Sequence, residues 1–128
     1  MKNVMVCVTQ QKTCDRLIKH GAKFLGDDEG ELFVIHVAKY GFNFLGNSKE
    51  GEALEYLFEK SKEYGANLTV VRSNDVLKTL VELIEKNCIT HVVLGESSEA
   101  EQKNDMVRNL VKRVKGKATI EVIPAEAE

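Results

Sequence analysis

Five short runs of apolar, mostly β-branched residues alternate along the sequence with four stretches whose apolar residues recur at helical spacing. The runs fall at residues 3–9, 31–37, 67–72, 91–95 and 118–123. Runs that are apolar at nearly every position are typical of strands covered on both faces, as in a parallel sheet. Strands that alternate with helices require crossover connections. We therefore predict an α/β fold in which residues 1–128 form a single domain, a doubly wound five-stranded parallel sheet with helices on both faces.

Polar residues at the loop ends indicate where the four helices begin. The expected caps are Thr13 or Asp15 for the first helix, Ser48 for the second, Ser73, Asn74 or Asp75 for the third, and Asp105 for the fourth. Two apolar stripes are predicted to face the core: Ala53, Leu54, Leu57 and Phe58 on the second helix, and Met106, Val107, Leu110, Val111 and Val114 on the fourth.

The charge balance excludes some classes of protein. The chain has 18 Lys and Arg against 20 Asp and Glu, so it lacks the basic excess of a general nucleic-acid or membrane-surface binder. No apolar run reaches the roughly 18 residues of a membrane helix, and the amino end is too short for a signal peptide. We therefore expect a cytoplasmic protein that neither inserts into membranes nor binds nucleic acid.

The three cysteines and three histidines suggest neither a metal site nor a catalytic centre. Cysteines 7, 14 and 88 form no C-x-x-C pair, so neither a disulfide framework nor a zinc site is expected. His20, His36 and His91 are scattered over one helix and two strands. His36, inside a strand, is interpreted as a hydrogen-bonded core residue rather than a general base.

The carboxyl ends of the predicted strands are the expected binding region. Gly95 ends a buried strand, and a polar run that contains Ser97 and Ser98 leads from it to the last helix. In open α/β sheets, ligands bind where strand carboxyl ends and helix amino ends converge. We predict a pocket of mixed apolar and hydroxyl character there, with these candidate residues: Thr9, Gln10, Gln11, Val37, Gly95, Ser97, Ser98 and Asp105.

The sequence from Val4 to Ile123 resembles the universal stress protein family. The resemblance rests on the opening VMVCVTQQKTCDRLIKHGAKFL, the segment DVLKTLVELIEKNCITHVVLGESS and the closing IEVIP. It is nearest to the stress-protein-like domain of Kdp-type potassium-sensor histidine kinases, whose first helix is similar to the residues from Asp15 to Lys19. The resemblance implies a Rossmann-like sheet of the adenine nucleotide alpha hydrolase type, with strand order 3-2-1-4-5. It also implies a role in stress response or signalling, with osmotic or potassium sensing as the nearest parallel.

The loop from Gly95 to Asp105 departs from the pattern of nucleotide-binding members of the family. Those members carry Gly-x-x-Gly and, about nine residues later, Gly-Ser or Gly-Thr, so that backbone amides approach phosphates. Here Gly95 matches the first glycine, Ser98 replaces the second, and the last pair falls near Asp105. We therefore favour a non-enzymatic module without a cofactor. The alternative is a protein that binds ATP, AMP or a cyclic dinucleotide through this loop, with slow ATP hydrolysis at most.

The last strand and an aromatic loop are the candidate interaction surfaces. Family members often form homodimers through their last strands, which implies an interface at Ile120, Val122 and Ile123. An uncovered apolar edge strand favours pairing, whereas Glu121 and Pro124 would blunt the edge of a monomer. The loop at residues 38–48 carries Tyr40, Phe42, Phe44 and Leu45. These residues either cap the core or form a lid or docking patch for another protein, such as a sensor kinase or a transporter.

Overall fold

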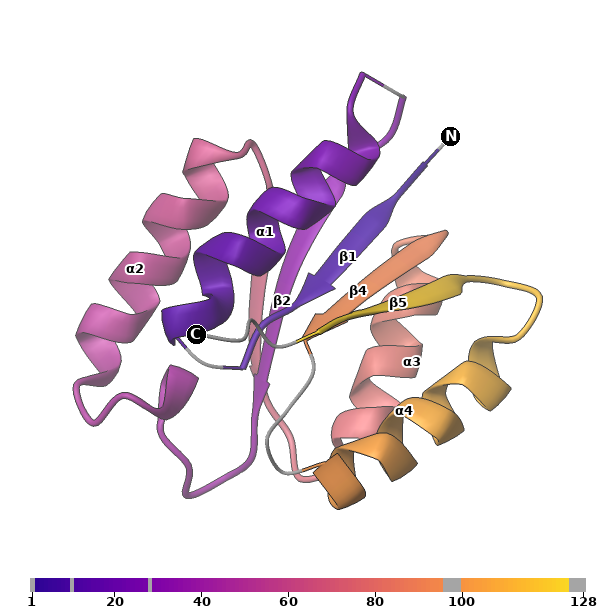
Figure 1. Cartoon of the computed structure of the whole chain (residues 1–128). Coiled ribbons are helices and arrows are strands. Elements are labelled where there is room, and N and C mark those ends of the chain that lie inside the picture. The colour runs from indigo at the N-terminus through magenta and orange to yellow at the C-terminus, as the bar shows by residue number, and fades with distance from the viewer. Residues whose placement is uncertain (1, 10, 28, 96–99, 125–128) are drawn as a thin grey trace.

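In the computed structural model of the chain, the five strands form one parallel sheet in the order β3-β2-β1-β4-β5 (Figure 1). The structure describes residues 2–9, 11–27, 29–95 and 100–124. The elements are β1 (Val4–Cys7), α1 (Gln11–Leu25), β2 (Leu32–Ala38), the 3-10 turn η1 (Phe44–Gly46), α2 (Glu50–Glu63), β3 (Asn67–Arg72), α3 (Val76–Lys86), β4 (His91–Gly95), α4 (Ala100–Val114) and β5 (Thr119–Ile123). The predicted fold class and strand order are confirmed.

Helices cover both faces of the sheet, which explains why nearly every position of the central strands is apolar. α1 and α2 lie on one face, and α3 and α4 lie on the other (Figure 1). In β1, Val4 and Val6 pack toward the first pair of helices, whereas Met5 and Cys7 pack toward the second. Because side chains alternate between the two faces of a strand, β1 needs an apolar residue at every position.

Three of the four expected helix starts differ from the structure. α1 begins at Gln11, so Thr13 and Asp15 lie inside its first turns rather than at its cap. At the start of α2 the N-cap residue is Lys49 rather than Ser48, and the Lys49 side chain makes no capping hydrogen bond. α4 begins at Ala100, so Asp105 lies inside the helix. The residues of α4 before Asp105 include Ala, Glu, Gln and Lys, which are good helix formers and extend the helix toward the strand.

The third helix begins as predicted. The side chain of Asp75 accepts a hydrogen bond of 3.0 Å from the backbone N–H of Lys78. This bond satisfies one of the free N–H groups in the first helical turn. At the other end of α3, Asn87 occupies the C-cap position.

Two predicted apolar stripes are narrower in the structure. On α2, Ala53 and Leu57 are buried, whereas Leu54 and Phe58 are 36% and 60% exposed. On α4, Val111 is 45% exposed. α2 lies over the β3 side of the sheet, so one flank of the helix has nothing beneath it to cover. Within the described part of the chain, no helix is long and apolar enough to cross a membrane.

Candidate functional site

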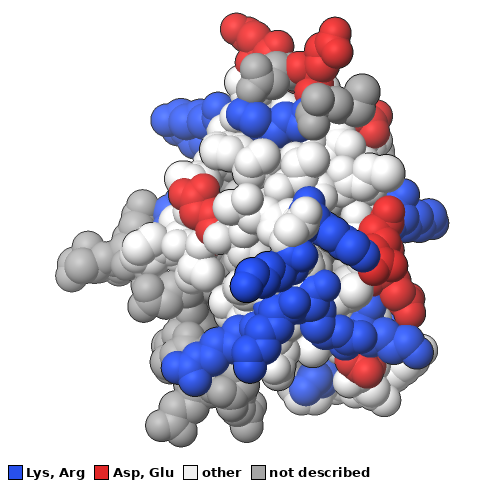
Figure 2. Space-filling view, turned by 90° about the vertical axis from the view of Figure 1, so that its right-hand side faces the viewer, with Lys and Arg blue, Asp and Glu red and all other residues white. Residues whose placement is uncertain are grey.

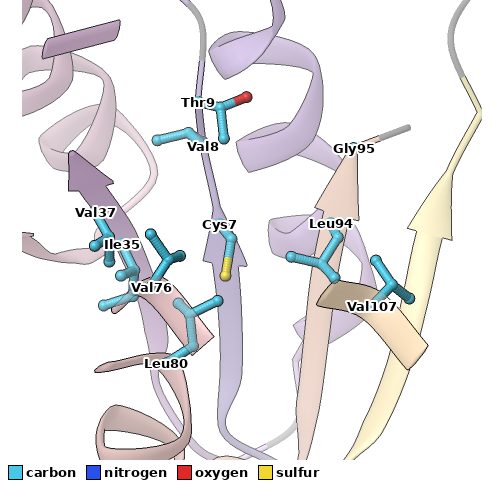
Figure 3. Close-up of a pocket in the computed structure, with 10 residues that line it drawn as sticks. All are labelled: Cys7, Val8, Thr9, Ile35, Val37, Val76, Leu80, Leu94, Gly95 and Val107. Atoms are coloured by element: carbon cyan, nitrogen blue, oxygen red, sulfur yellow. The ribbon is translucent and has the colours of Figure 1, made fainter. Parts of the chain in front are cut away.

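A cavity of about 60 Å³ opens at the carboxyl ends of β1, β2 and β4. Side chains from the strand ends and from α3 and α4 surround it (Figure 3). The lining residues are Cys7, Val8, Thr9, Ile35, Val37, Val76, Leu80, Leu94, Gly95 and Val107. This is the sheet edge at which α/β folds bind ligands.

Three of the residues predicted from the sequence line this cavity: Thr9, Val37 and Gly95. Gln10, Ser97 and Ser98 lie outside the described residues. Gln11 is the first residue of α1, and Asp105 is an interior residue of α4. The sequence reasoning missed the contributions of Cys7, Val8, Ile35, Val76, Leu80, Leu94 and Val107. The strand residues among them could have been identified in the sequence from their position near the carboxyl end of an apolar strand.

The backbone of β2 extends beyond the end of β1. Pairing between the two strands stops at Cys7 and Ile35, whereas β2 continues to pair with β3 as far as Ala38. The C=O of Ile35 accepts a hydrogen bond of 2.9 Å from the N–H of Val8, so the backbone of Ile35 faces β1. Backbone direction alternates along a strand, so Val37 faces the same side, beyond the β1 ladder. The N–H and C=O of Val37 therefore lie at the open end of the sheet, beside the cavity.

The described residues that line the cavity are largely apolar, and none of them is Asp, Glu, Lys, Arg or His. Burial raises the pKa of the Cys7 thiol to about 12, so its sulfur is a neutral thiol rather than a nucleophilic thiolate at neutral pH. Thr9 brings a hydroxyl group at the exposed rim (Figure 3). A methyl group at Gly95 would approach Leu17 Cδ1 to 3.1 Å, so packing against α1 also favours glycine there.

His36 anchors the loop that follows β2. Its imidazole is 3% exposed; Nδ1 lies 2.8 Å from the C=O of Val8, and Nε2 accepts a hydrogen bond of 3.0 Å from the N–H of Leu45. The ring is therefore neutral, with its proton on Nδ1. Burial lowers the pKa of His36; the bond to Val8 opposes this shift, and the charge of Arg72 adds to it. The predicted role of a hydrogen-bonded core histidine is confirmed.

Arg72, at the end of β3, holds the same loop from the other side. Its guanidinium lies 4.1 Å from the centroid of the Phe44 ring and forms an ion pair with Glu50. It also donates hydrogen bonds to the carbonyls of Lys39, at 3.3 Å, and Phe42, at 2.7 Å. One guanidinium thus fixes both ends of the loop and one aromatic ring in its middle.

The aromatic loop is divided between the core and the surface. Leu45 is buried, and Phe44 packs against the core beside His36. Tyr40 and Phe42 are 61% and 66% exposed. The inner half of the loop therefore caps the core, and the outer half presents aromatic side chains at the surface.

The other histidines belong to separate structural contacts. Nε2 of His20 lies 3.1 Å from the Glu121 carboxylate, which connects α1 to β5. Nδ1 of His91 lies 2.8 Å from the hydroxyl of Thr90, and its ring packs against Phe24. Among the residues that the structure describes, no three His, Cys, Asp or Glu residues come together in a way that could hold a metal ion.

Comparison with known proteins gives a fold but no sequence family. No family model matches the sequence, and no curated protein matches it. Solved structures match over nearly the whole chain. A hypothetical protein whose biochemical function was assigned from its structure is 16% identical, with a TM-score of 0.70 over 99% of this chain and 98% of that chain. A universal stress protein in complex with cAMP is 13% identical, with a TM-score of 0.64 over 99% and 98%.

Two further structures show what else this fold accommodates. A universal stress protein from Archaeoglobus fulgidus in complex with dAMP is 14% identical, with a TM-score of 0.60 over 96% of this chain and 98% of that chain. Pantoate-beta-alanine ligase from Francisella tularensis, complexed with beta-gamma ATP and beta-alanine, is 14% identical, with a TM-score of 0.66 over 99% of this chain but only 60% of the ligase. The chain therefore has the fold shared by universal stress proteins and adenine nucleotide alpha hydrolase-like proteins.

Proposed function

We propose that this protein is a signalling module of the universal stress protein type that binds a planar heterocycle, such as the base of an adenine nucleotide, in the cavity at the carboxyl edge. The observation that carries the proposal is the apolar cavity beside the open backbone of Val37. In this proposal residues 1–128 form a single domain. The resemblance to Kdp-type sensors suggests cytoplasmic osmotic or potassium signalling as its setting.

The cavity suits the flat, weakly polar face of a purine. Aliphatic side chains of Ile35, Leu80 and Leu94 offer apolar contact to a ring. Adenine carries a donor and an acceptor side by side on one edge, and the N–H and C=O of Val37 form the complementary pair. The structural neighbours in complex with cAMP and dAMP support this class of ligand.

The charge of the next loop favours a ligand with few phosphates. Glu96, Glu99 and Glu101 follow Gly95 in the sequence. Carboxylates repel a polyphosphate, even though the amino end of α4 favours an anion. We therefore propose that adenosine, AMP or a cyclic nucleotide binds more tightly than ATP.

The proposed action is non-enzymatic. Among the described residues that line the cavity, the Cys7 thiol is the only ionisable group, and its raised pKa keeps it neutral. The module would instead signal by presenting a ligand-dependent surface to a partner. In the homodimer that the resemblance predicts, Ile120 and Val122 of β5 would be shared between two copies, whereas Ile123 is buried within its own protomer.

Calorimetric titration with adenosine, AMP, cAMP, cyclic di-AMP and ATP tests the proposal. Two variants obstruct the cavity: Val37→Phe fills it, and Thr9→Trp covers its exposed rim. Val70→Phe is the matched control, because Val70 lies on the neighbouring strand and packs toward the opposite face of the sheet. Circular dichroism would verify that each variant is folded.

We expect at least one adenine ligand to bind the native protein and the two cavity variants to bind it about tenfold or more weakly, which corresponds to about 1.4 kcal/mol. Val70→Phe should retain native affinity. If no ligand in the series binds the folded native protein at millimolar concentration, the proposal is wrong. It is also wrong if the control loses as much affinity as the cavity variants.

A further inference from the structure

An exposed apolar ridge runs along the flank of α2 that faces the β3 edge of the sheet. It consists of Leu54 and Phe58, which are both exposed and lie four residues apart, so they are neighbours on one side of the helix. Lys60, on the other flank of α2, forms an ion pair of 3.4 Å with Asp15 of α1. That flank therefore faces α1, and the apolar ridge lies on the outer side, beyond α1.

Contacts at both ends of α2 hold the ridge beside β3. The carboxylate of Glu50, the first residue of α2, forms an ion pair with the guanidinium of Arg72, the last residue of β3. The ridge begins one helical turn after this ion pair. At the other end, the N–H of Ala66, directly before β3, donates a hydrogen bond of 2.8 Å to the C=O of Ser61 in α2. The helix, its ridge and the strand therefore form one surface.

The outer backbone groups of β3 are open. β3 is an edge strand and pairs with β2. The N–H of Ser73 donates a hydrogen bond of 3.0 Å to the C=O of Ala38, so the backbone of Ser73 faces β2. Because this direction alternates along a strand, the N–H and C=O groups of Leu68, Val70 and Arg72 face outward. Among the described residues no strand lies beside these groups, so an additional strand can pair with them.

This edge remains available in the homodimer that the resemblance predicts. β3 and β5 form opposite edges of the sheet, and α2 lies on the β3 side (Figure 1). Pairing of two copies through β5 therefore leaves β3 and the apolar ridge of each copy exposed.

The exposed charge of α2 is acidic. Its exposed charged residues are Glu52, Glu55, Glu59, Glu63 and Lys62. Glu55 lies three residues before Phe58 and Glu59 follows it directly, so carboxylates border the ridge. A basic partner would be attracted to this surface.

The opposite edge of the sheet has the reverse charge. The residues from α4 to the start of β5 include five exposed basic side chains: Arg108, Lys112, Arg113, Lys115 and Lys117. Figure 2, which looks at this side of the molecule, shows Lys and Arg side chains gathered in a band. A basic partner would be repelled there, so the charge distribution directs it to the β3 edge.

Other occupants match the surface less well. Carboxylates beside the ridge repel the phosphates of a nucleic acid and of an anionic membrane. In a twofold interface the same patch of both copies meets, so a second copy would place one acidic α2 against another. A basic polypeptide meets neither obstacle, and in extended form it can also complete the open hydrogen-bond ladder of β3.

We propose that β3 and α2 form a docking surface for an extended basic segment of another protein. The segment adds a strand to the outer edge of β3, packs apolar side chains against Leu54 and Phe58, and directs Lys or Arg side chains toward Glu55 and Glu59. The inference does not depend on the ligand of the cavity, because none of these residues lines it.

Fluorescence anisotropy with a labelled peptide of the repeat Thr-Val-Thr-Lys tests the proposal. In an extended peptide of this repeat, valine and lysine share one face. A peptide with glutamate in place of lysine is the charge-reversed control. The informative variants are Phe58→Ser and Glu55→Lys. Val111→Ser on α4 and Glu82→Lys on α3 are their matched controls, because both residues are exposed on the opposite face of the sheet. Circular dichroism would verify that each variant is folded.

Amide hydrogen exchange shows where the peptide binds. A strand added to β3 should protect the outward amides of Leu68, Val70 and Arg72 from exchange. The amides of β5 should exchange at the same rate with and without peptide. Exchange is also measured without peptide at several protein concentrations, which detects a second copy on the same edge.

We expect the lysine peptide to bind and the glutamate peptide not to bind. Phe58→Ser should weaken binding by about tenfold, Glu55→Lys by severalfold, and the two control variants by less than about twofold. Equal binding of the two peptides, no binding of the lysine peptide at millimolar concentration, or protection confined to β5 would overturn the proposal. Protection of the β3 amides that rises with protein concentration in the absence of peptide would overturn it in favour of a second copy.

Discussion

Replacing His36 by leucine tests whether one buried imidazole fixes the loop of residues 39–49 on the edge of the sheet. Leucine is close to histidine in size and preserves the apolar packing, but it can neither donate to the C=O of Val8 nor accept from the N–H of Leu45. Val8 is 1% exposed and Leu45 is 3% exposed, so water does not easily replace the lost partner. The substitution therefore leaves one buried acceptor and one buried donor without a hydrogen bond.

The expected cost follows from these two groups. Each buried polar group that loses its partner destabilises a protein by about 1–3 kcal/mol, so His36→Leu, which affects two such groups, should lower the free energy of unfolding by about 2–6 kcal/mol. Asparagine retains a donor near the position of Nδ1, and glutamine retains an acceptor near that of Nε2. His36→Asn and His36→Gln should therefore each show roughly half of the loss.

The pH dependence of stability provides a second signature. Burial lowers the pKa of His36 from its ordinary value of 6.5, so the unfolded chain binds a proton at a pH where the folded protein does not. Stability must then fall as the pH drops through 6.5 toward the lower folded-state pKa. A protonated Nε2 can no longer accept the Leu45 hydrogen bond. The leucine variant lacks this contribution.

Urea unfolding monitored by circular dichroism, at several values between about pH 5 and pH 7.5, measures both effects. We expect a lower midpoint for His36→Leu at every pH and a smaller loss on acidification than in the native protein. The reasoning is refuted if His36→Leu costs less than about 1 kcal/mol at neutral pH. It is also refuted if the variant and the native protein lose stability in parallel on acidification.

Three further substitutions test other parts of the structure. Cys88 follows α3 with a φ of 52°, and the N–H of the next residue, Ile89, donates a hydrogen bond of 3.0 Å to the C=O of Ile84. Because glycine adopts a positive φ without steric cost, Cys88→Gly should stabilise the protein against thermal unfolding by about 0.5–1 kcal/mol, and an unchanged or lower midpoint would contradict this. Gly30 has a φ of +142°, and a Cβ there would lie 1.6 Å from the carbonyl oxygen of Lys2. Gly30→Ala should therefore destabilise the protein by more than about 2 kcal/mol in urea unfolding, whereas the control Gly51→Ala should not destabilise it. Arg72→Lys keeps the charge but loses the planar fork, so limited proteolysis should cleave the loop at residues 39–49 faster than in the native protein; equal cleavage rates would show that Arg72 does not fix the loop.

The strand pattern was sufficient to predict a five-stranded parallel sheet, because apolar runs indicate burial, whereas the order of the strands was expected from the family resemblance. The predicted strands at residues 67–72 and 91–95 have the same bounds in the structure. The starts of α1 and α4 were not predictable from caps alone, since good helix formers extend a helix past a polar residue such as Asp105. The exposure of Leu54 and Phe58 depends on where α2 lies over the sheet, which helical spacing does not specify.

The site was predictable only where it follows from topology. Thr9, Val37 and Gly95 were found because the carboxyl ends of parallel strands converge at one edge. Val76 and Val107 were not, because their part in the cavity depends on how α3 and α4 pack on the sheet. The pairing of His36 with Leu45 joins residues nine apart across a loop and has no local sequence signal.

Amide chemical shifts of the isotope-labelled protein during titration with AMP provide the most direct test of the proposed ligand site. The amide of Val37 should shift most, since we propose that it donates to the base. The amides of Thr9, Gly95 and Val107 should shift with it, because these residues line the same cavity. Shifts confined to the opposite edge of the sheet, near Asn3 and Cys88, would contradict the proposal, as would no shift at millimolar AMP.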